Sequence, residues 1–92
     1  MKYNVGDFVK FNRYHLQDQM GVIVKKMNDG SDIYMISIKE YGGDYTCMTD
    51  EHIIRRINLP IENKLALIGS FGDWWYKFHK SILQSIIVEA LN

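Results

Sequence analysis

Hydrophobic and polar residues alternate along most of the first 57 residues, in short runs separated by glycine-bearing turns. Alternation with a period of two is typical of β-strands, because successive side chains point to opposite faces of a sheet. The runs recur about every ten residues, which is the spacing of a small all-β unit. The pattern predicts strands at residues 5–11, 20–27, 33–39, 45–48 and 53–57.

Polar segments are expected to connect these strands. Residues 12–19 form an irregular connection after the first strand. A hairpin is predicted at 28–31 and a turn at 41–44, because glycine accepts the positive φ that tight turns need. Residues 49–52 have the pattern of one helical turn, with Thr49 placed as its N-cap.

The only proline, Pro60, marks a change from the strand pattern to a helical one. Apolar residues at helical spacing predict a short helix over 61–68, and Gly69 stands where a glycine commonly ends a helix. A strand through 65–67 is the alternative interpretation of the same residues. The helix is the favoured interpretation of this segment.

The longest predicted helix covers residues 73–91, which neither glycine nor proline interrupts. Ser70 and Asp73 resemble a capping box at its start. At 100° per residue its apolar side chains cover an arc of about 260°, whereas a helix lying on one surface needs only about 100°. We therefore expect two contact sides, one on the rest of the protein and one for a second copy or another protein, through Trp74, Trp75, Phe78, Ile82 and Ile86. The alternative, equally favoured, is that the small core uses the whole apolar arc.

Four segments resemble the pattern of SH3-like barrels of the bacterial and KOW type: residues 6–11 (GDFVKF), 21–25 (GVIVK), 34–36 (YMI) and 50–54 (DEHII). Gly21 stands where the KOW submotif has its glycine. The resemblance covers about residues 3–59 and implies a five-stranded barrel that binds ligands with its loops and one sheet face. Families of this type contact RNA, ribosomes, RNA polymerase or other proteins. Stand-alone barrels of this kind are frequent among phage and mobile-element accessory proteins.

The expected fold is therefore mainly β, in the α+β class. An SH3-like barrel at 1–59 is followed by a helical hairpin at 60–92 that packs on it.

Charge argues against a protein that binds nucleic acid without specificity. The chain has 11 basic and 11 acidic residues, and its formal net charge is zero. Affinity for phosphate backbones comes from a basic excess that releases counterions, and that excess is absent here. The basic residues with a potential contact role are Lys10, Arg13, Lys25, Lys26, Arg55 and Arg56. Solvated strand faces explain them better than a contact with phosphate or an acidic protein does.

Little in the sequence indicates catalysis, a metal or a cofactor. Cys47 is the only cysteine and stands in a strand, while His15, His52 and His79 lack the spacing of a metal site. No phosphate-binding loop or nucleophile motif is present. One cysteine permits no internal disulfide, and neither a signal peptide nor a membrane span is visible, so a cytoplasmic protein is expected.

The sequence favours a non-catalytic module that recognises another protein and modulates a larger machine. The alternative is a KOW-type barrel that binds RNA or DNA, and self-association through the last helix is open under either interpretation. Tyrosines in loops offer a large contact area with a polar tip, as interfaces favour. The expected ligand-binding residues are Tyr14, His15, Tyr34, Tyr41, Tyr45, Lys25, Lys26, Arg55 and Arg56.

Overall fold

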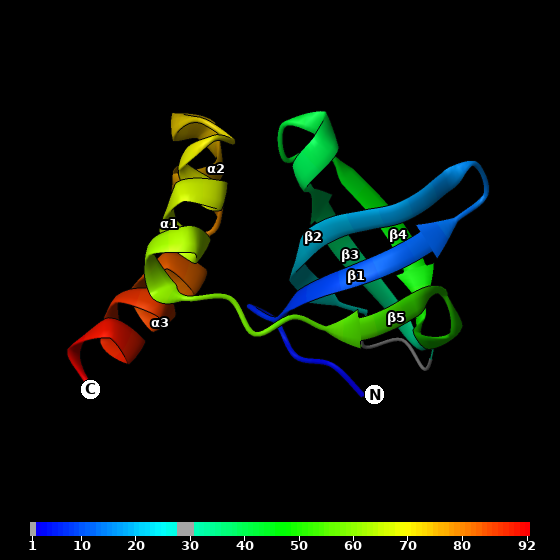
Figure 1. The fold of residues 1–92 in the computed structure, drawn as a ribbon, viewed down its shortest axis with the longest axis horizontal. Helices are drawn as coiled ribbons and strands as arrows, with labels where there is room; N and C mark the ends of the chain where they lie inside the picture. Colours follow the sequence, from blue (N-terminus) through cyan, green and yellow to red (C-terminus); the bar gives the residue numbers. More distant parts are fainter. Residues whose placement is uncertain (1, 28–30) are drawn as a thin grey trace.

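The computed structural model describes residues 2–27 and 31–92, and it shows an antiparallel five-stranded sheet followed by three helices (Figure 1). The α+β class is thus confirmed. The strands lie in the order β4-β3-β2-β1-β5. They are β1 (Phe8–Arg13), β2 (Leu16–Lys26), β3 (Ile33–Ile38), β4 (Tyr45–Thr49) and β5 (Ile53–Arg56). The helices are α1 (Ile61–Gly69), α2 (Asp73–Phe78) and α3 (Lys80–Leu91).

The expected barrel is not formed. In the part of the chain that the structure describes, no ladder joins β4 to β5, so these two strands are the edges of an open sheet. A 3₁₀ turn, η2 (Asp50–His52), connects them. The opening is bridged instead by one side chain: Arg13 of β1 donates hydrogen bonds to the Thr46 hydroxyl, at 2.7 Å, and to the Cys47 carbonyl. The Arg13 side chain therefore contacts the edge of β4, where the expected barrel would have been closed by strand pairing.

Three of the four ladders contain a register shift, and the shifts bend the sheet. They lie between Phe11 and Arg13, between Lys10 and Phe11, and between Ile23 and Lys25. A bulge bends its strand and increases the local twist. The ladder between β3 and β4 is regular throughout.

The connection expected at 12–19 is mostly strand, with a bulge, which corrects the expectation from the sequence. Arg13 pairs with Leu16, so β1 and β2 form a tight hairpin that turns at Tyr14, whose φ is 50°. Polar residues in an exposed two-stranded ribbon give no apolar alternation, and for this reason the strands were missed there. The predicted hairpin at 28–31 falls on residues 28–30, outside the described residues.

The sheet is buried on both faces. Its concave face holds a core made by the strands themselves: Val9, Phe11, Ile23, Tyr34, Ile36, Ile38, Met48 and Ile53. On the other face, Phe8 and Val22 pack with Leu67, Ile68, Phe71, Trp75, Ile82 and Ile86 of the helical segment. Trp75 and Ser37 are fully buried there, and the Trp75 indole donates a hydrogen bond to the Ser37 hydroxyl at 2.9 Å. The helices are thus one layer packed on the sheet, as Figure 1 shows.

The C-terminal segment is not a two-helix hairpin. The short helix at 61–69 is confirmed over the strand alternative, but the helix expected over 73–91 is broken at His79, which has φ −128° and ψ 40°. The His79 ring packs on Trp75 and meets the Tyr45 hydroxyl, and these contacts hold it out of helical geometry. Tertiary contacts at His79 therefore override the helical propensity of the surrounding residues.

Two expected helix caps also differ. The Ser70 hydroxyl donates to the Leu67 carbonyl at the end of α1, and Gly72, with φ 98°, precedes α2 without a side-chain cap. Thr49 does precede η2, but its hydroxyl contacts the side chains of Glu51 and His52. No helix in the described ranges is long and apolar enough to cross a membrane.

Candidate functional site

The tyrosines expected to bind a ligand have different surroundings. Tyr14 is 81% exposed at the tip of the β1–β2 hairpin, beside the exposed His15, and Tyr41 is about half exposed. Tyr34 is fully buried, and its hydroxyl accepts the backbone N–H of Tyr3 at 3.1 Å. Burial, and then the Asp50 carboxylate, raise the pKa of Tyr34 above its usual value. Tyr34 is therefore a core residue, whereas Tyr14 and Tyr41 lie on the surface.

Tyr45, Trp74 and Phe78 form an exposed aromatic surface where β4 meets α2. The Tyr45 ring lies edge-on to Trp74, with centroids 5.9 Å apart and an interplanar angle of 88°. Trp74 is 37% exposed and Phe78 75% exposed. Phe78 follows Trp74 by four residues, so both lie on the same side of the helix. Aromatic pairs of this geometry add about 0.5–1.5 kcal/mol beyond burial.

His79 fixes the position of this aromatic surface. Its Nε2 lies 2.6 Å from the Tyr45 hydroxyl, and the two rings meet edge-on at 5.8 Å. Burial lowers the pKa of His79 and raises the pKa of Tyr45. At neutral pH the imidazole is therefore neutral and the phenol protonated, and the tautomer of the imidazole sets which of the two groups donates the hydrogen bond.

The sheet and the helices bring these residues together through two buried contacts. Ser37 pairs with Tyr45 across β3 and β4, and Ser37 also holds the Trp75 indole. Trp74 is thereby placed beside Tyr45. In the turn before β4, a Cβ on Gly43 would lie 2.7 Å from the Phe71 ring, so only glycine permits this close approach.

The residues expected to form an interface on the last helix are divided by the structure. Trp74 and Phe78 point outward, whereas Trp75, Ile82 and Ile86 are buried against the sheet. A second set of exposed apolar residues lies on α3: Ile87, Val88 and Leu91. One apolar side of the segment is thus in the core and the other is uncovered.

The basic residues do not form one patch. Arg56 lies 3.6 Å from Asp7, and the Lys26 ammonium donates to Asn4 at 3.1 Å. Arg56 pairs with Val9, which in turn pairs with Gly21. Lys25 lies four residues beyond Gly21, about 13 Å along the strand direction. The backbone of Lys25 is therefore separated from that of Arg56, whereas Lys26 and Arg56 both contact the turn from Asn4 to Asp7.

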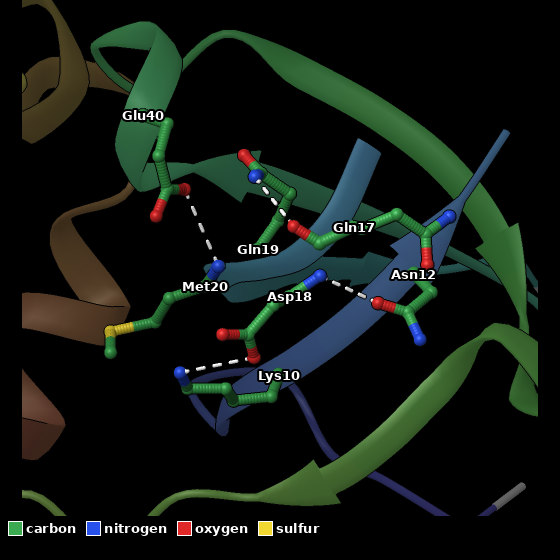
Figure 2. Close-up of polar contacts among 7 residues, drawn as sticks. All are labelled: Lys10, Asn12, Gln17, Asp18, Gln19, Met20 and Glu40. Carbon is green, nitrogen blue, oxygen red and sulfur yellow. Dashed lines mark hydrogen bonds and ion pairs between the residues drawn. The ribbon is translucent and has the colours of Figure 1, made fainter. Parts of the chain in front are cut away.

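Lys10 belongs to a polar network that joins the β1–β2 hairpin to η1 (Lys39–Tyr41), shown in Figure 2. Its ammonium contacts the Asp18 carboxylate at 3.3 Å, and the Asp18 amide donates to the Asn12 side chain at 2.6 Å. The Met20 amide donates to Glu40 at 3.3 Å, and the Gln19 side chain to the Gln17 carbonyl at 3.0 Å (Figure 2). The pair of Lys10 and Asp18 links the two strands of the hairpin, so a ligand that binds Lys10 would have to displace Asp18.

Two hollows differ in how they relate to the expected site. A groove of about 560 Å³ between the sheet and α1 is lined by Met20, Lys39, Leu59, Glu62, Asn63, Ala66 and Leu67, and none of these was expected to bind. A smaller hollow of about 230 Å³ is lined by Arg13, Tyr14, Ile33, Cys47, Met48, Thr49 and His52. The smaller hollow therefore lies between β4 and two residues with an expected contact role, Arg13 and Tyr14.

Sequence reasoning missed the pairing of Tyr45 with Trp74 and the bridge from Arg13 to β4. Both contacts join residues more than 28 positions apart, and no short-range pattern encodes them. Within residues 2–27 and 31–92 no group of three or more His, Cys, Asp or Glu side chains is arranged to hold a metal ion. No family of known proteins, no curated protein and no solved structure matches this chain.

Proposed function

We propose that this protein is a non-catalytic binding module that recognises another protein through the aromatic surface of Tyr45, Trp74 and Phe78. The observation that carries the proposal is the outward position of Trp74 and Phe78 on α2. Tryptophan, tyrosine and phenylalanine are enriched in protein interfaces, and tryptophan and tyrosine are frequent among the few residues that dominate the binding energy. A module of this size would act by holding one component of a larger machine.

The rigidity of the aromatic surface supports the proposal. Tyr45 is held by His79 and by its contact with Trp74, and α2 is held by the buried bond from Trp75 to Ser37. Side chains that are ordered before binding lose little conformational entropy on binding. The same residues could therefore bind a partner without first being rearranged.

The nucleic-acid alternative has less support. The net charge is zero, and Lys10, Lys26 and Arg56 each have a polar partner within the chain. The acidic turn η2 stands between β4 and β5, where the SH3-like resemblance places such a turn, so an opened SH3-like scaffold is part of the proposal. That scaffold is compatible with either kind of ligand.

The test is affinity purification from the native host with three baits, followed by mass spectrometry. The baits are the wild type, Phe78→Ser on the aromatic surface, and Leu91→Ser as a matched control, since Leu91 is 81% exposed on α3. We expect a stoichiometric protein partner with the wild type and the control, and its loss with Phe78→Ser. The direct interaction is then measured by calorimetry with the purified partner.

Two results would contradict the proposal. One is a partner retained equally by Phe78→Ser and the wild type. The other is co-purification of nucleic acid alone, confirmed by a gel shift whose affinity falls steeply with salt.

A further inference from the structure

The two edges of the sheet are protected to different degrees. β5 has Arg55 and Arg56 among its four residues, and its ladder with β1 is shifted by a bulge. β4 (Tyr45–Thr49) has no charged residue, no proline and no bulge. Edge strands usually carry charges, prolines or bulges that prevent pairing with other chains. β4 lacks all three of these protections.

Every second residue of β4 directs its backbone polar groups away from the sheet. The Ile38 amide donates to the Asp44 carbonyl at 2.9 Å, so Asp44 faces β3. Antiparallel strands alternate, so Thr46 and Met48 also face β3, while Tyr45, Cys47 and Thr49 face outward. The bond from Arg13 to the Cys47 carbonyl agrees with this assignment.

Arg13 occupies the position that a neighbouring strand would take. Its guanidinium donates to the outward Cys47 carbonyl and, at 2.7 Å, to the Thr46 hydroxyl, and it lies 5.1 Å from the centre of the Tyr14 ring. The hollow of about 230 Å³ beside these residues has room for a side chain of an added strand. Tyr45 then connects the same edge to the aromatic surface.

We propose that β4 accepts an extended segment of the partner protein as a sixth strand, and that Arg13 holds this place until the segment binds. Backbone hydrogen bonds of an added strand give affinity, and pockets along it give specificity. The inference rests on the proposed function, because it specifies how a partner that contacts the aromatic surface is bound.

The charges around β4 determine the kind of segment. In the register that pairs all of β4 with a second copy, Asp44 would stand opposite Asp50 of that copy at both ends. Like charges directly opposite destabilise a strand pair, so a second copy is disfavoured. The Asp50 carboxylate is directed toward the buried Tyr34, whereas Asp44 is exposed directly before β4. The segment that fits is therefore uncharged along its centre and carries lysine or arginine at the end beside Asp44.

The test begins with selection of random linear peptides displayed on phage, using the wild-type protein as the target. We expect peptides that are uncharged along their centre and carry lysine or arginine at one end. The Cys47→Pro variant removes an outward N–H without breaking the ladder to β3, and edge strands admit proline there. Cys47→Ala is the matched control, and thermal melting of both variants verifies the fold.

A selected peptide should lose at least tenfold in affinity with Cys47→Pro and keep it with Cys47→Ala. Arg13→Ala should strengthen binding about fivefold, since a hydrogen bond to a charged group no longer competes. On binding, the amides of Tyr45, Cys47 and Thr49 should become protected from hydrogen exchange.

Three results would overturn the inference. If peptides lose affinity with Phe78→Ser but not with Cys47→Pro, the proposed function stands and strand addition fails. If sedimentation shows a dimer that Cys47→Pro dissolves, the occupant of β4 is a second copy. If no peptide binds β4 at all, the edge is not an acceptor; the purification experiment then decides the proposed function separately.

Discussion

Trp74 and Trp75 are adjacent in the chain and belong to two regions with different surroundings. Trp75 lies in the layer between the sheet and the helices, is fully buried and donates to Ser37. Trp74 lies on the outer side of the same helix, partly exposed beside Tyr45. The buried layer holds α2 on the sheet, and that attachment positions the outer aromatic surface. Stability therefore depends on one side of this short helix, and the proposed recognition of a partner on the opposite side.

The largest effect is expected in the buried layer. Trp75→Ala should reduce the free energy of unfolding by about 3–5 kcal/mol, because it removes a large core side chain and leaves a cavity. Trp74→Ala should reduce it by about 1 kcal/mol or less, since mainly the contact with Tyr45 is lost. Urea denaturation of both variants measures the difference. Equal losses would contradict the division between the two regions.

The next effect concerns binding and not stability. Phe78→Ser should weaken the partner complex about thirtyfold, as truncation of an exposed aromatic residue at the centre of an interface commonly costs 2 kcal/mol or more. Its own unfolding free energy should change by about 0.5 kcal/mol or less. Calorimetry and denaturation on the same samples give the two numbers. A variant that unfolds more easily but binds normally would reverse the assignment of Phe78.

Ser37→Ala should lower the free energy of unfolding by about 1–2 kcal/mol, because the buried Trp75 N–H loses its acceptor. The backbone pairing of Ser37 with Tyr45 is expected to persist. Thermal melting with intrinsic fluorescence measures the loss. The control is Ser85→Ala, since the exposed Ser85 hydroxyl bonds only to the Ser81 carbonyl of its own helix. Equal losses in the two variants would argue against a specific role of the buried bond.

The smallest effect is a pH dependence that arises from His79. Its pKa is lower in the folded protein than its ordinary value, so the unfolded chain binds the proton more readily. The stability contribution of neutral His79 is complete above about pH 6.5, the unfolded value, and is lost as pH falls through the lower folded pKa. Denaturation at a series of pH values should show a decrease that His79→Gln flattens. An unchanged profile in His79→Gln would place the titration elsewhere.

The strands of this fold could largely be predicted from the sequence, because alternation over residues such as 33–38 and 45–48 is a local signal. The open edge could not. Only the three residues of η2 separate β4 from β5, yet whether these strands pair depends on the bends in β1 and β2, which no local pattern encodes. The hairpin at Tyr14 was missed because its polar residues have no apolar alternation.

The candidate site could be predicted only in part. An apolar arc of about 260° indicates two sides of a helix but does not determine which is buried. Trp74 and Trp75 are equivalent in the sequence pattern, and only the structure distinguishes them, through the burial of Trp75 and its bond to Ser37. Tyr34 likewise has the same strand pattern as an exposed tyrosine, although its hydroxyl is held inside the core by Tyr3.

The protein contains two tryptophans, so a nitrogen-15 NMR spectrum has two indole N–H signals, one from each region, that can be compared in the same sample. Titrating the captured partner into labelled protein, with cross-saturation from the partner's protons, tests the central claim directly. Saturation should reach the Trp74 indole N–H and leave the Trp75 indole N–H unaffected. Saturation of neither indole, with transfer to a distant surface such as α3, would show that the aromatic surface does not contact the partner.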